Sequence, residues 1–493
     1  MKVFWILAAV AFVVLGAASV WMGGLNQDEG WYLYAANLVA EGRVPYRDFF
    51  YTQGPLLPIV YSAFAWVWHA WGLLGARIFT LLLGAASVLF AAALARRLAP
   101  QERRNEAALI AFLLLGSNLY HVYYLAIPKT YALASLFVAT GFYLLSVAWS
   151  GARGVNRLAA VGAGLCLAFA SGTRISLGAL LATTGLCLLV ARQWRTLAAF
   201  CVGGFVGLAL VYGPCLLDSR TFAGLMAAQR YHAARGGFDP VWTVGSLSRL
   251  VRWYLPTFLA VGLWLFSGRR ASAEDDSARH ILRALVVGFV AVFAIQMLAP
   301  FPYEDYQVPI MGLLATFGAV RLVGLCESPL LRRFAALLAL GAAFACSFGS
   351  PLLEKWSTNG QDRFWSVKKT SYELQQLRRV AAEIENLDPG GDDLLTQDLY
   401  LAIETRRKVP EGLEMGPFAM LTDAEWRTLL ASAPCRIAAM SGYTFAVEPP
   451  ACGQRPVSQQ MDYWETLKRR YELVGREEAF GQNATTLLIL RRR

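Results

Sequence analysis

The sequence predicts a polytopic α-helical membrane protein with a soluble α/β domain at its C-terminal end. Of the 493 residues, 56% are hydrophobic and only 16% are charged, whereas soluble domains carry about 25% charged residues. The apolar residues form long runs that hold almost no charge, each near the ~20 residues that a helix needs to span the hydrocarbon layer. After residue 353 the composition becomes charged and mixed, which indicates a separate soluble domain.

Helices are the only plausible spanning elements, because lipid offers no partner to free backbone groups and the strands of a barrel would alternate in polarity. The first apolar run follows Lys2 as in a secretory leader, but no convincing cleavage site follows it, so we expect an uncleaved first helix. We expect about eleven spans, over residues 3–24, 74–96, 107–124, 130–149, 157–173, 176–191, 197–217, 251–267, 281–299, 307–323 and 334–350.

The formal net charge is +11, and the arginines lie mostly in short gaps between the apolar runs. We interpret them as determinants of helix orientation rather than as a nucleic-acid surface, and the positive-inside rule makes these gaps cytoplasmic. The N-terminus is then cytoplasmic and the C-terminal domain lies outside. The sequence has no GxxxxGKS loop, HExxH motif or zinc-spaced Cys/His cluster. We therefore expect no cofactor, and a divalent metal is possible but not indicated.

Residues 1–353 are expected to form the membrane domain, with a structured external loop at 25–73, and residues 354–493 the extracytoplasmic domain. Within the loop, apolar residues from Trp31 to Val39 follow the spacing of an amphipathic helix, which we expect to lie in the membrane interface. The aromatic segment 56–71 is expected to lie there as well.

The C-terminal domain shows short-range signals of both helix and strand. An apolar stripe over 377–387 and a capping box at Thr422–Glu425 predict helices. Segments 393–396, 436–440 and 485–490 are typical of strands. Cys435 and Cys452 are its two cysteines, and they form either an external disulfide or two unpaired thiols.

The stretch Asn26–Tyr34 is the most informative part of the chain, because it places two adjacent acids just after the first span. It continues into Arg43-Val-Pro-Tyr-Arg-Asp48 and Tyr51-Thr-Gln-Gly-Pro55. Helix capping alone would explain the acids: Asp28 as a cap, or Asn26 and Glu29 as a capping box.

This arrangement resembles the C-type membrane glycosyltransferases, in particular their protein O-mannosyltransferase-like and aminoarabinose-transferase-like branch. The similarity is strongest over residues 26–97, including Arg77, and extends through the polytopic layout to about residue 350. In that family the external loop after the first helix carries the catalytic aspartate. The resemblance therefore implies a catalytic role for Asp28, with Glu29 as its neighbour.

The resemblance also implies a sugar donor on a polyprenyl phosphate, transferred with inversion by a single displacement. Such a reaction needs one carboxylate to accept the acceptor's proton and cations to hold the departing phosphate. The aminoarabinose transferases carry a lysine just before the proline of the second stretch, where this chain has Gly54. Arg77, Lys129 and Arg174 are the candidate replacements, although each could instead extend into the lipid interface.

Further candidate substrate-binding residues lie in the external loop, Tyr51 and Gln53, and near the predicted outer ends of spans, His121, Glu304 and Asp305. His121 and its tyrosine neighbours either line a sugar pocket or belong to an interfacial aromatic belt. Glu304 and Asp305 either bind the acceptor, pair with Arg174 or belong to a solvated loop.

We therefore expect an inverting glycosyltransferase on the outer face of a bacterial cytoplasmic membrane. Its partners would be a polyprenyl-phosphate-linked sugar and a lipid, glycan or protein acceptor, with no nucleic acid. The alternative is a lipid or solute transporter, which would place ionisable groups near the bilayer midplane. A non-catalytic assembly partner is a third possibility, against which the intact Asp28 argues.

Overall fold

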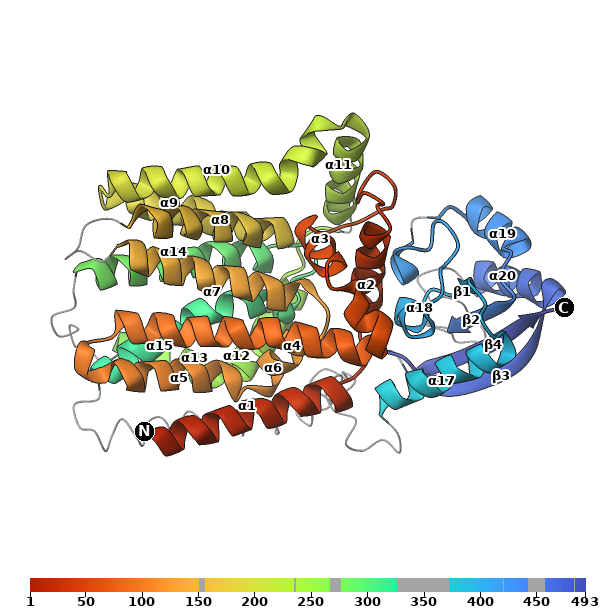
Figure 1. The fold of residues 1–493 in the computed structure, drawn as a ribbon, viewed down its shortest axis with the longest axis horizontal. Coiled ribbons are helices and arrows are strands. Elements are labelled where there is room, and N and C mark those ends of the chain that lie inside the picture. The colour runs from red at the N-terminus through yellow and green to blue at the C-terminus, as the bar shows by residue number, and fades with distance from the viewer. Residues whose placement is uncertain are drawn as a thin grey trace.

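The computed structural model describes residues 1–149, 156–234, 236–266, 276–325, 372–419, 421–441, 457–482 and 484–493. A bundle of helices forms one end of the molecule and a small domain built on a four-stranded sheet forms the other (Figure 1). The predicted fold class, a helical membrane protein with a C-terminal α/β domain, is confirmed.

The bundle is built from long apolar helices and shorter connecting ones. The helices of this part of the chain are α1 (Lys2–Met22), α2 (Gln27–Ala40), α3 (Leu56–Ser62), α4 (Ala65–Leu98), α5 (Arg104–Gly116), α6 (Leu119–Ala126), α7 (Thr130–Ala148), α8 (Arg157–Thr173), α9 (Gly178–Val190), α10 (Trp194–Leu217), α11 (Ser219–Ala234), α12 (Pro240–Trp253), α13 (Leu255–Phe266), α14 (Asp276–Met297) and α15 (Val308–Leu325).

Within the described residues, six helices are long and apolar enough to cross a membrane, or up to seven if a bent pair forms one span. That pair, Gln101–Gly116 and Leu119–Ala126, is bent by 71°. Three shorter apolar helices, α8, α9 and α13, cover other predicted spans. The expected count of eleven is therefore not confirmed, and the predicted span 334–350 lies outside the described residues.

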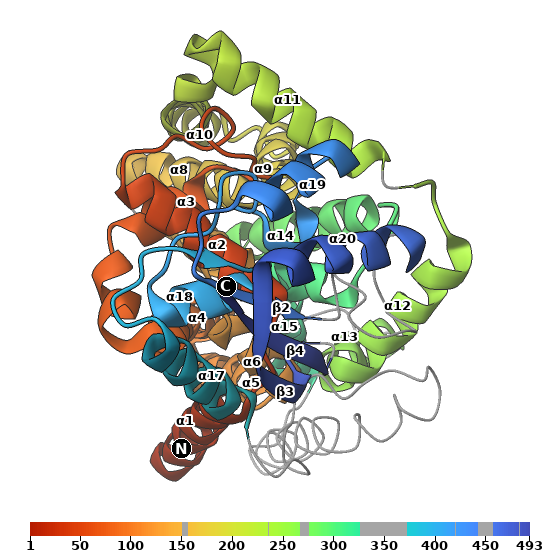
Figure 2. The same cartoon turned by 90° about the vertical axis from the view of Figure 1, so that its right-hand side faces the viewer.

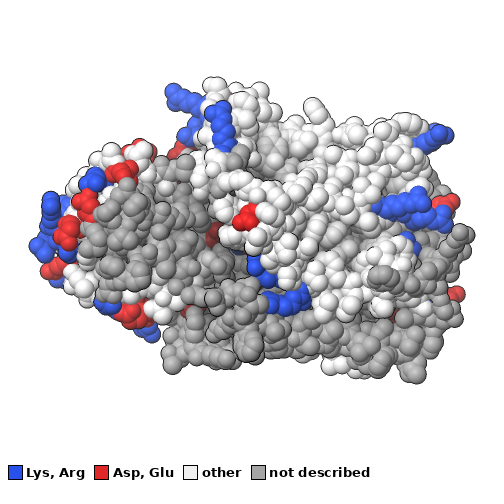
Figure 3. Space-filling view, turned by 180° about the vertical axis from the view of Figure 1, so that it is seen from behind, with Lys and Arg blue, Asp and Glu red and all other residues white. Residues whose placement is uncertain are grey.

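The outer surface of the bundle agrees with a membrane environment. Large apolar side chains such as Phe205 and Leu210 of α10 are 75% and 63% exposed. In the space-filling view the bundle carries few charged atoms, whereas charged atoms gather over the C-terminal domain (Figure 3). The chain is a multi-pass membrane protein.

The predicted amphipathic helix is α2, but it has no exposed face of the expected width. Most of its residues are buried, from Trp31 to Ala36 without interruption. It lies between the bundle and the C-terminal domain (Figure 1), and in the end-on view the C-terminal domain lies in front of it (Figure 2). The aromatic segment that follows forms α3 and the start of α4, which breaks at Gly72 in the left-handed region with φ 62°, a conformation natural to glycine.

In the described residues of the C-terminal domain, the sheet is combined with four α-helices. Its elements are α17 (Glu373–Leu387), β1 (Leu394–Leu395), α18 (Leu399–Thr405), α19 (Asp423–Ser432), β2 (Ile437–Ser441), α20 (Val457–Arg470), β3 (Tyr471–Phe480) and β4 (Thr485–Arg492). The strand order is β1-β2-β4-β3, with β1 parallel to β2 and the other pairs antiparallel.

Most local predictions in this domain are confirmed. The capping box of Thr422 and Glu425 starts α19, and β1, β2 and β4 fall on the three predicted strands. Strand β3 was not predicted, because four of its ten residues are charged and its burial does not alternate regularly. Cys435 is a buried free thiol just before β2, and the choice between a disulfide and two unpaired thiols stays a prediction. Cys452 lies outside the described residues.

Glycines bring α8 and α10 into close contact. A methyl group at Gly164 would overlap the carbonyl oxygen of Phe200, and one at Gly203 would overlap that of Val161. Small residues at such interfaces let transmembrane helices approach closely, where packing drives their association.

We predict that Gly203→Ala lowers the melting temperature of the detergent-solubilised protein, since overpacking typically costs about 1–3 kcal/mol. Gly213→Ala is the matched control in the same helix, because a methyl group there meets open space. The Gly213→Ala variant should have an unchanged free energy of unfolding, or one raised by up to ~1 kcal/mol, because alanine has the higher helix propensity. Equal melting temperatures for the two variants would contradict the close packing.

Candidate active site

The acidic pair begins α2, and its two members have different tasks. Asn26 is the N-cap, whose side chain accepts a hydrogen bond from the peptide N–H of Asp28 at 3.0 Å. The carboxylate of Glu29 accepts from the peptide N–H of Asn26 at 2.9 Å, which completes the capping box. Capping therefore does not require the side chain of Asp28.

The Asp28 carboxylate faces a lysine from another helix. Its Oδ2 lies 2.8 Å from Nζ of Lys129, and its Oδ1 accepts a hydrogen bond from Nε1 of Trp31 at 3.1 Å. The Asp28 side chain keeps 28% of its surface open, whereas that of Lys129 keeps 6%. The lysine is thus a buried, fixed charge, and the aspartate remains accessible.

Lys129 precedes α7 and contacts a second carboxylate. Its Nζ lies 3.2 Å from Oδ2 of Asp305, which also accepts a hydrogen bond from the hydroxyl of Tyr131 at 2.9 Å. Asp305 belongs to the short helical turn Glu304–Gln307 before α15. The ammonium also lies 4.9 Å from the centre of the Tyr131 ring, a favourable cation–π distance.

Arg174 ends α8 beside the same group. Its guanidinium lies 5.1 Å from the ring centre of Tyr131 and 4.6 Å from that of Tyr306. One terminal nitrogen donates to the hydroxyl of Thr130 at 3.1 Å, while the buried Nε has no hydrogen-bond partner. A fixed arginine with a free donor is well suited to bind an anion.

A cavity of about 330 Å³ adjoins Arg174 and Tyr306. Its polar lining includes Thr52 and Gln53 of the external loop, and its apolar lining includes Ile175 and Ile295. These two isoleucines are 39% and 49% exposed on the outside of the bundle. The cavity therefore joins a cationic end to an apolar surface.

The external loop approaches α8 closely at Gly54. A methyl group there would overlap the carbonyl oxygen of Gly172, two residues before Arg174. No lysine side chain fits at this position in the observed packing. The resemblance implies a cation at this position. Here Arg174, at the end of α8, lines the same cavity as the neighbouring Gln53 instead.

The charges around Asp28 favour its ionised form. Burial opposes ionisation, but the ammonium of Lys129 and hydrogen bonds from Lys129 and Trp31 outweigh it, so the pKa of Asp28 lies below its ordinary value. The carboxylate is therefore ionised at neutral pH and able to accept a proton.

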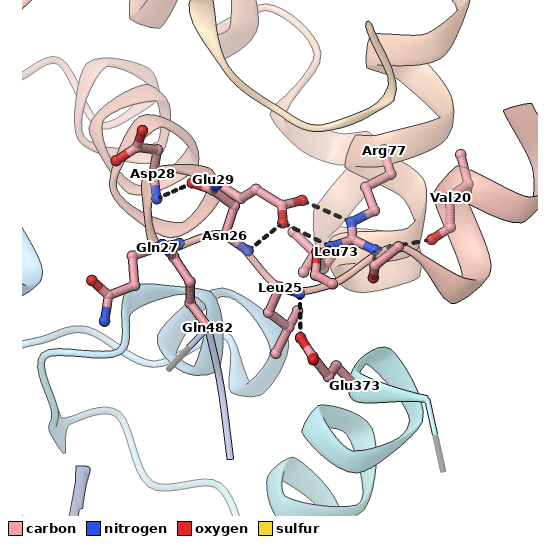
Figure 4. Close-up of polar contacts among 12 residues, drawn as sticks. Val20, Leu25, Asn26, Gln27, Asp28, Glu29, Leu73, Arg77, Glu373 and Gln482 are labelled. Carbon is pink, nitrogen blue, oxygen red and sulfur yellow. Dashed lines mark hydrogen bonds and ion pairs between the residues drawn. The ribbon is translucent and has the colours of Figure 1, made fainter. Parts of the chain in front are cut away.

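Glu29 forms a second, separate ion pair (Figure 4). Its two oxygens accept from Nε and a terminal nitrogen of Arg77, both at 2.7 Å, and both side chains are fully buried. The remaining donors of Arg77 go to the carbonyl oxygens of Val20, Gly23 and Gly24 at 2.9–3.1 Å. All five N–H groups are used, so none is left for a phosphate.

These contacts correct two expectations. The sequence predicts that Glu29 lies next to the catalytic residue and that Arg77 binds the sugar donor. In the structure the two side chains form a buried ion pair with each other instead. Removing one partner of a buried ion pair is strongly destabilising, because it leaves the other charge buried without compensation. Neither side chain is therefore available to bind a substrate.

Other candidates lie away from the Asp28 cluster or are inaccessible. Tyr51 is fully buried among aromatic rings. His121 pairs with the hydroxyl of Tyr254 at 2.8 Å and lines a cavity of about 10 Å³, far too small for a sugar. Glu304 pairs with Arg249 at 3.2 Å.

Two contributors to the cluster were not predicted. The rings of Tyr131 and Tyr306 contact the predicted cations Lys129 and Arg174, and the hydroxyl of Tyr131 donates to Asp305. The only local signal was that Tyr131 follows Lys129 by two residues and Tyr306 adjoins Asp305. Among the described residues, no three His, Cys, Asp or Glu side chains gather as metal ligands would.

The fold is shared with solved membrane enzymes. ArnT from Cupriavidus metallidurans, in a structure bound to undecaprenyl phosphate, matches with a TM-score of 0.65 at 14% identity, over 99% of this chain and 97% of that chain. This chain has the fold of a C-type glycosyltransferase.

A second structural relative is the oligosaccharyltransferase of Archaeoglobus fulgidus, whose complex with zinc and sulfate matches with a TM-score of 0.54 at 12% identity. That match covers 95% of this chain and 72% of the archaeal one. No protein-family model and no curated protein sequence matches the chain. The structural matches confirm the predicted resemblance at the level of the fold.

We predict that Arg77→Met destabilises the protein by about 3–5 kcal/mol, because it leaves Glu29 as an uncompensated buried charge. The double variant Glu29→Gln/Arg77→Met should recover part of this loss. Thermal unfolding in detergent measures both. A stable Arg77→Met protein that has lost only donor binding would instead restore Arg77 as a substrate ligand.

Proposed function

We propose that this protein transfers a sugar from a polyprenyl-phosphate carrier to a hydroxyl group of a lipid, glycan or protein acceptor, with inversion at the anomeric carbon. One observation carries the proposal. The accessible carboxylate of Asp28 pairs with the buried Lys129, which packs on the same Tyr131 ring as the buried Arg174. Arg174 in turn lines a cavity whose other wall is apolar and exposed on the outside of the bundle.

In the proposed reaction the acceptor oxygen attacks the anomeric carbon as the carbon–oxygen bond to the phosphate breaks. Asp28 takes the proton of the attacking hydroxyl, which is general-base catalysis. The polyprenyl phosphate leaves with the bonding electron pair, and it needs no strong acid because it is a weakly basic anion. The products are the glycosylated acceptor and the carrier phosphate.

Lys129 and Arg174 are proposed to bind that phosphate. Its negative charge increases as the bond breaks, and fixed cations at a low-dielectric boundary stabilise such charge most strongly. Lys129 can shift its interaction from Asp28 to the phosphate, which leaves the carboxylate free for the acceptor. Both cations are already present, so the proposal requires no metal or other cofactor.

Asp305 is proposed to hold Lys129 in place through their 3.2 Å contact, while Tyr131 orients Asp305. Gln53, on the cavity wall, is a proposed donor contact. We further propose that the cluster and the C-terminal domain lie on the outer face of a bacterial cytoplasmic membrane, as the positive-inside rule indicates.

The transporter alternative receives less support. Transporters place binding groups near the bilayer midplane between broken helices. Here the charged cluster lies where the bundle meets the C-terminal domain, since Asp28 is in the first turn of α2, which lies between them (Figure 1). The undecaprenyl phosphate in the ArnT structure also agrees with a lipid-phosphate ligand for this fold.

We predict that Asp28→Asn lowers the rate of transfer by about 10²–10⁴-fold, the usual range for loss of a general base. The fold should survive, because Asn26 rather than Asp28 caps α2. Asp48→Asn is the control: it lies in the same external segment but pairs with the exposed Arg47. Purified variants are assayed for sugar transfer from labelled polyprenyl-phosphate donor, and full activity of Asp28→Asn would reject the mechanism.

The pH profile gives a further prediction. Asp28 accepts a proton only when ionised, so activity falls as the pH drops through its pKa, which Lys129 lowers. In Lys129→Met the ammonium that lowers the pKa of Asp28 is gone, so burial raises this pKa and the acid limb of kcat/KM should move to higher pH. The donor should also bind more weakly, because a proposed phosphate-binding cation is lost. Arg249→Met removes a cation paired with Glu304 and should leave the acid limb unchanged. An unmoved limb in Lys129→Met would argue against Asp28 as the base.

A further inference from the structure

We infer that the C-terminal domain positions the catalytic helix, and that Glu373 is its principal positioning residue. This inference rests on the proposed role of Asp28. Glu373 does not touch the proposed reacting atoms; it acts through the backbone of the segment that leads into α2 (Figure 4).

Two peptide N–H groups beside the N-cap of α2 are bound by the C-terminal domain. The peptide N–H of Leu25 donates to Oε2 of Glu373 at 2.5 Å, across 348 residues of sequence. That of Gln27 donates to Oε1 of Gln482 at 2.8 Å, across 455 residues. Buried peptide groups require partners, and here the partners come from α17 and from the turn between β3 and β4.

The domain also packs directly on the backbone of α2. A methyl group at Gly30 would overlap the peptide nitrogen of Tyr400, at the start of α18. Tyr400 is fixed in turn, because its hydroxyl donates to Asp398 at 2.9 Å. Gly30 is two residues after Asp28, so α18 sets how far this turn of α2 can move.

A third contact reaches the helix that carries Arg77. Oε2 of Glu404, on α18, accepts from the peptide N–H of Leu73 at 2.8 Å, just after the break in α4 at Gly72. Arg378 of α17 pairs with the same carboxylate at 3.1 Å. Leu73 is about one helical turn before Arg77.

Through these contacts the C-terminal domain fixes α2 and α4, the two helices that carry Glu29 and Arg77. Asp28 lies one residue before Glu29, while its partner Lys129 belongs to the bundle, as does Asp305, the second acid that pairs with Lys129. A shift of α2 therefore changes the distance between base and phosphate-binding cation. Misplacement by about 1 Å is enough to reduce a rate by ~10²-fold.

The experiment compares Glu373→Ala with Glu373→Gln in the full-length protein. The alanine removes the acceptor for Leu25, whereas the glutamine keeps a carbonyl oxygen there. Glu411→Ala is the matched control, because Glu411 is an exposed glutamate of the same domain. The measurements are hydrogen exchange of the peptides covering 24–31, the kcat of transfer and the KM for the donor.

We expect faster exchange over 24–31 in Glu373→Ala, with kcat lower by about 10–100-fold and the donor KM little changed. Glu373→Gln should recover much of kcat, and Glu411→Ala should match the wild type. If Glu373→Ala does not fold, Gln482→Ala should give the same pattern of exchange and kcat.

Two outcomes would overturn the inference in different ways. Unchanged kcat in Glu373→Ala, when Asp28→Asn is inactive, would reject the positioning role and leave the proposed function standing. Full transfer by Asp28→Asn would reject the proposed function itself, whatever the exchange data show.

Discussion

The arrangement of the site depends on one buried ion pair, Glu29 with Arg77. A fully buried guanidinium needs a carboxylate and acceptors for its remaining donors. Arg77 finds the carboxylate on α2 and the acceptors at the end of α1, among the carbonyls of Val20, Gly23 and Gly24. The end of α1, the start of α2 and α4 are thereby fixed to one another, and so is the backbone that carries Asp28.

Charge balance explains the second feature of the site. Asp28 and Asp305 share Lys129, and Arg174 packs against aromatic rings beside them. Uncompensated charge is costly where a membrane protein excludes water, so each acid is stable there only with a cation nearby. The same balance suits the proposed chemistry, because a phosphate anion can replace a carboxylate as the partner of Lys129.

The tight contact at Gly54 explains why the proposed phosphate-binding cation comes from another element. The resemblance to the aminoarabinose transferases expects a lysine at this position, yet the observed packing against Gly172 leaves no room for one. The same packing brings the external loop to the end of α8, where Arg174 lies. A cation from the bundle is thus proposed to do what the loop lysine does in those enzymes, within a fold shared at 14% identity.

The sequence by itself determined the membrane class, most of the apolar helices, the capping boxes at Asn26 and Thr422 and three of the four strands, because each depends on spacing over a few residues. It also singled out Asp28 through the resemblance. Only the tertiary structure decided which cation faces which acid, since Lys129 rather than Arg77 lies beside Asp28. It also decided that most of α2 is buried. The physical reason is that ionic partners are chosen by packing across 48–176 residues of sequence, a distance over which no local pattern carries information.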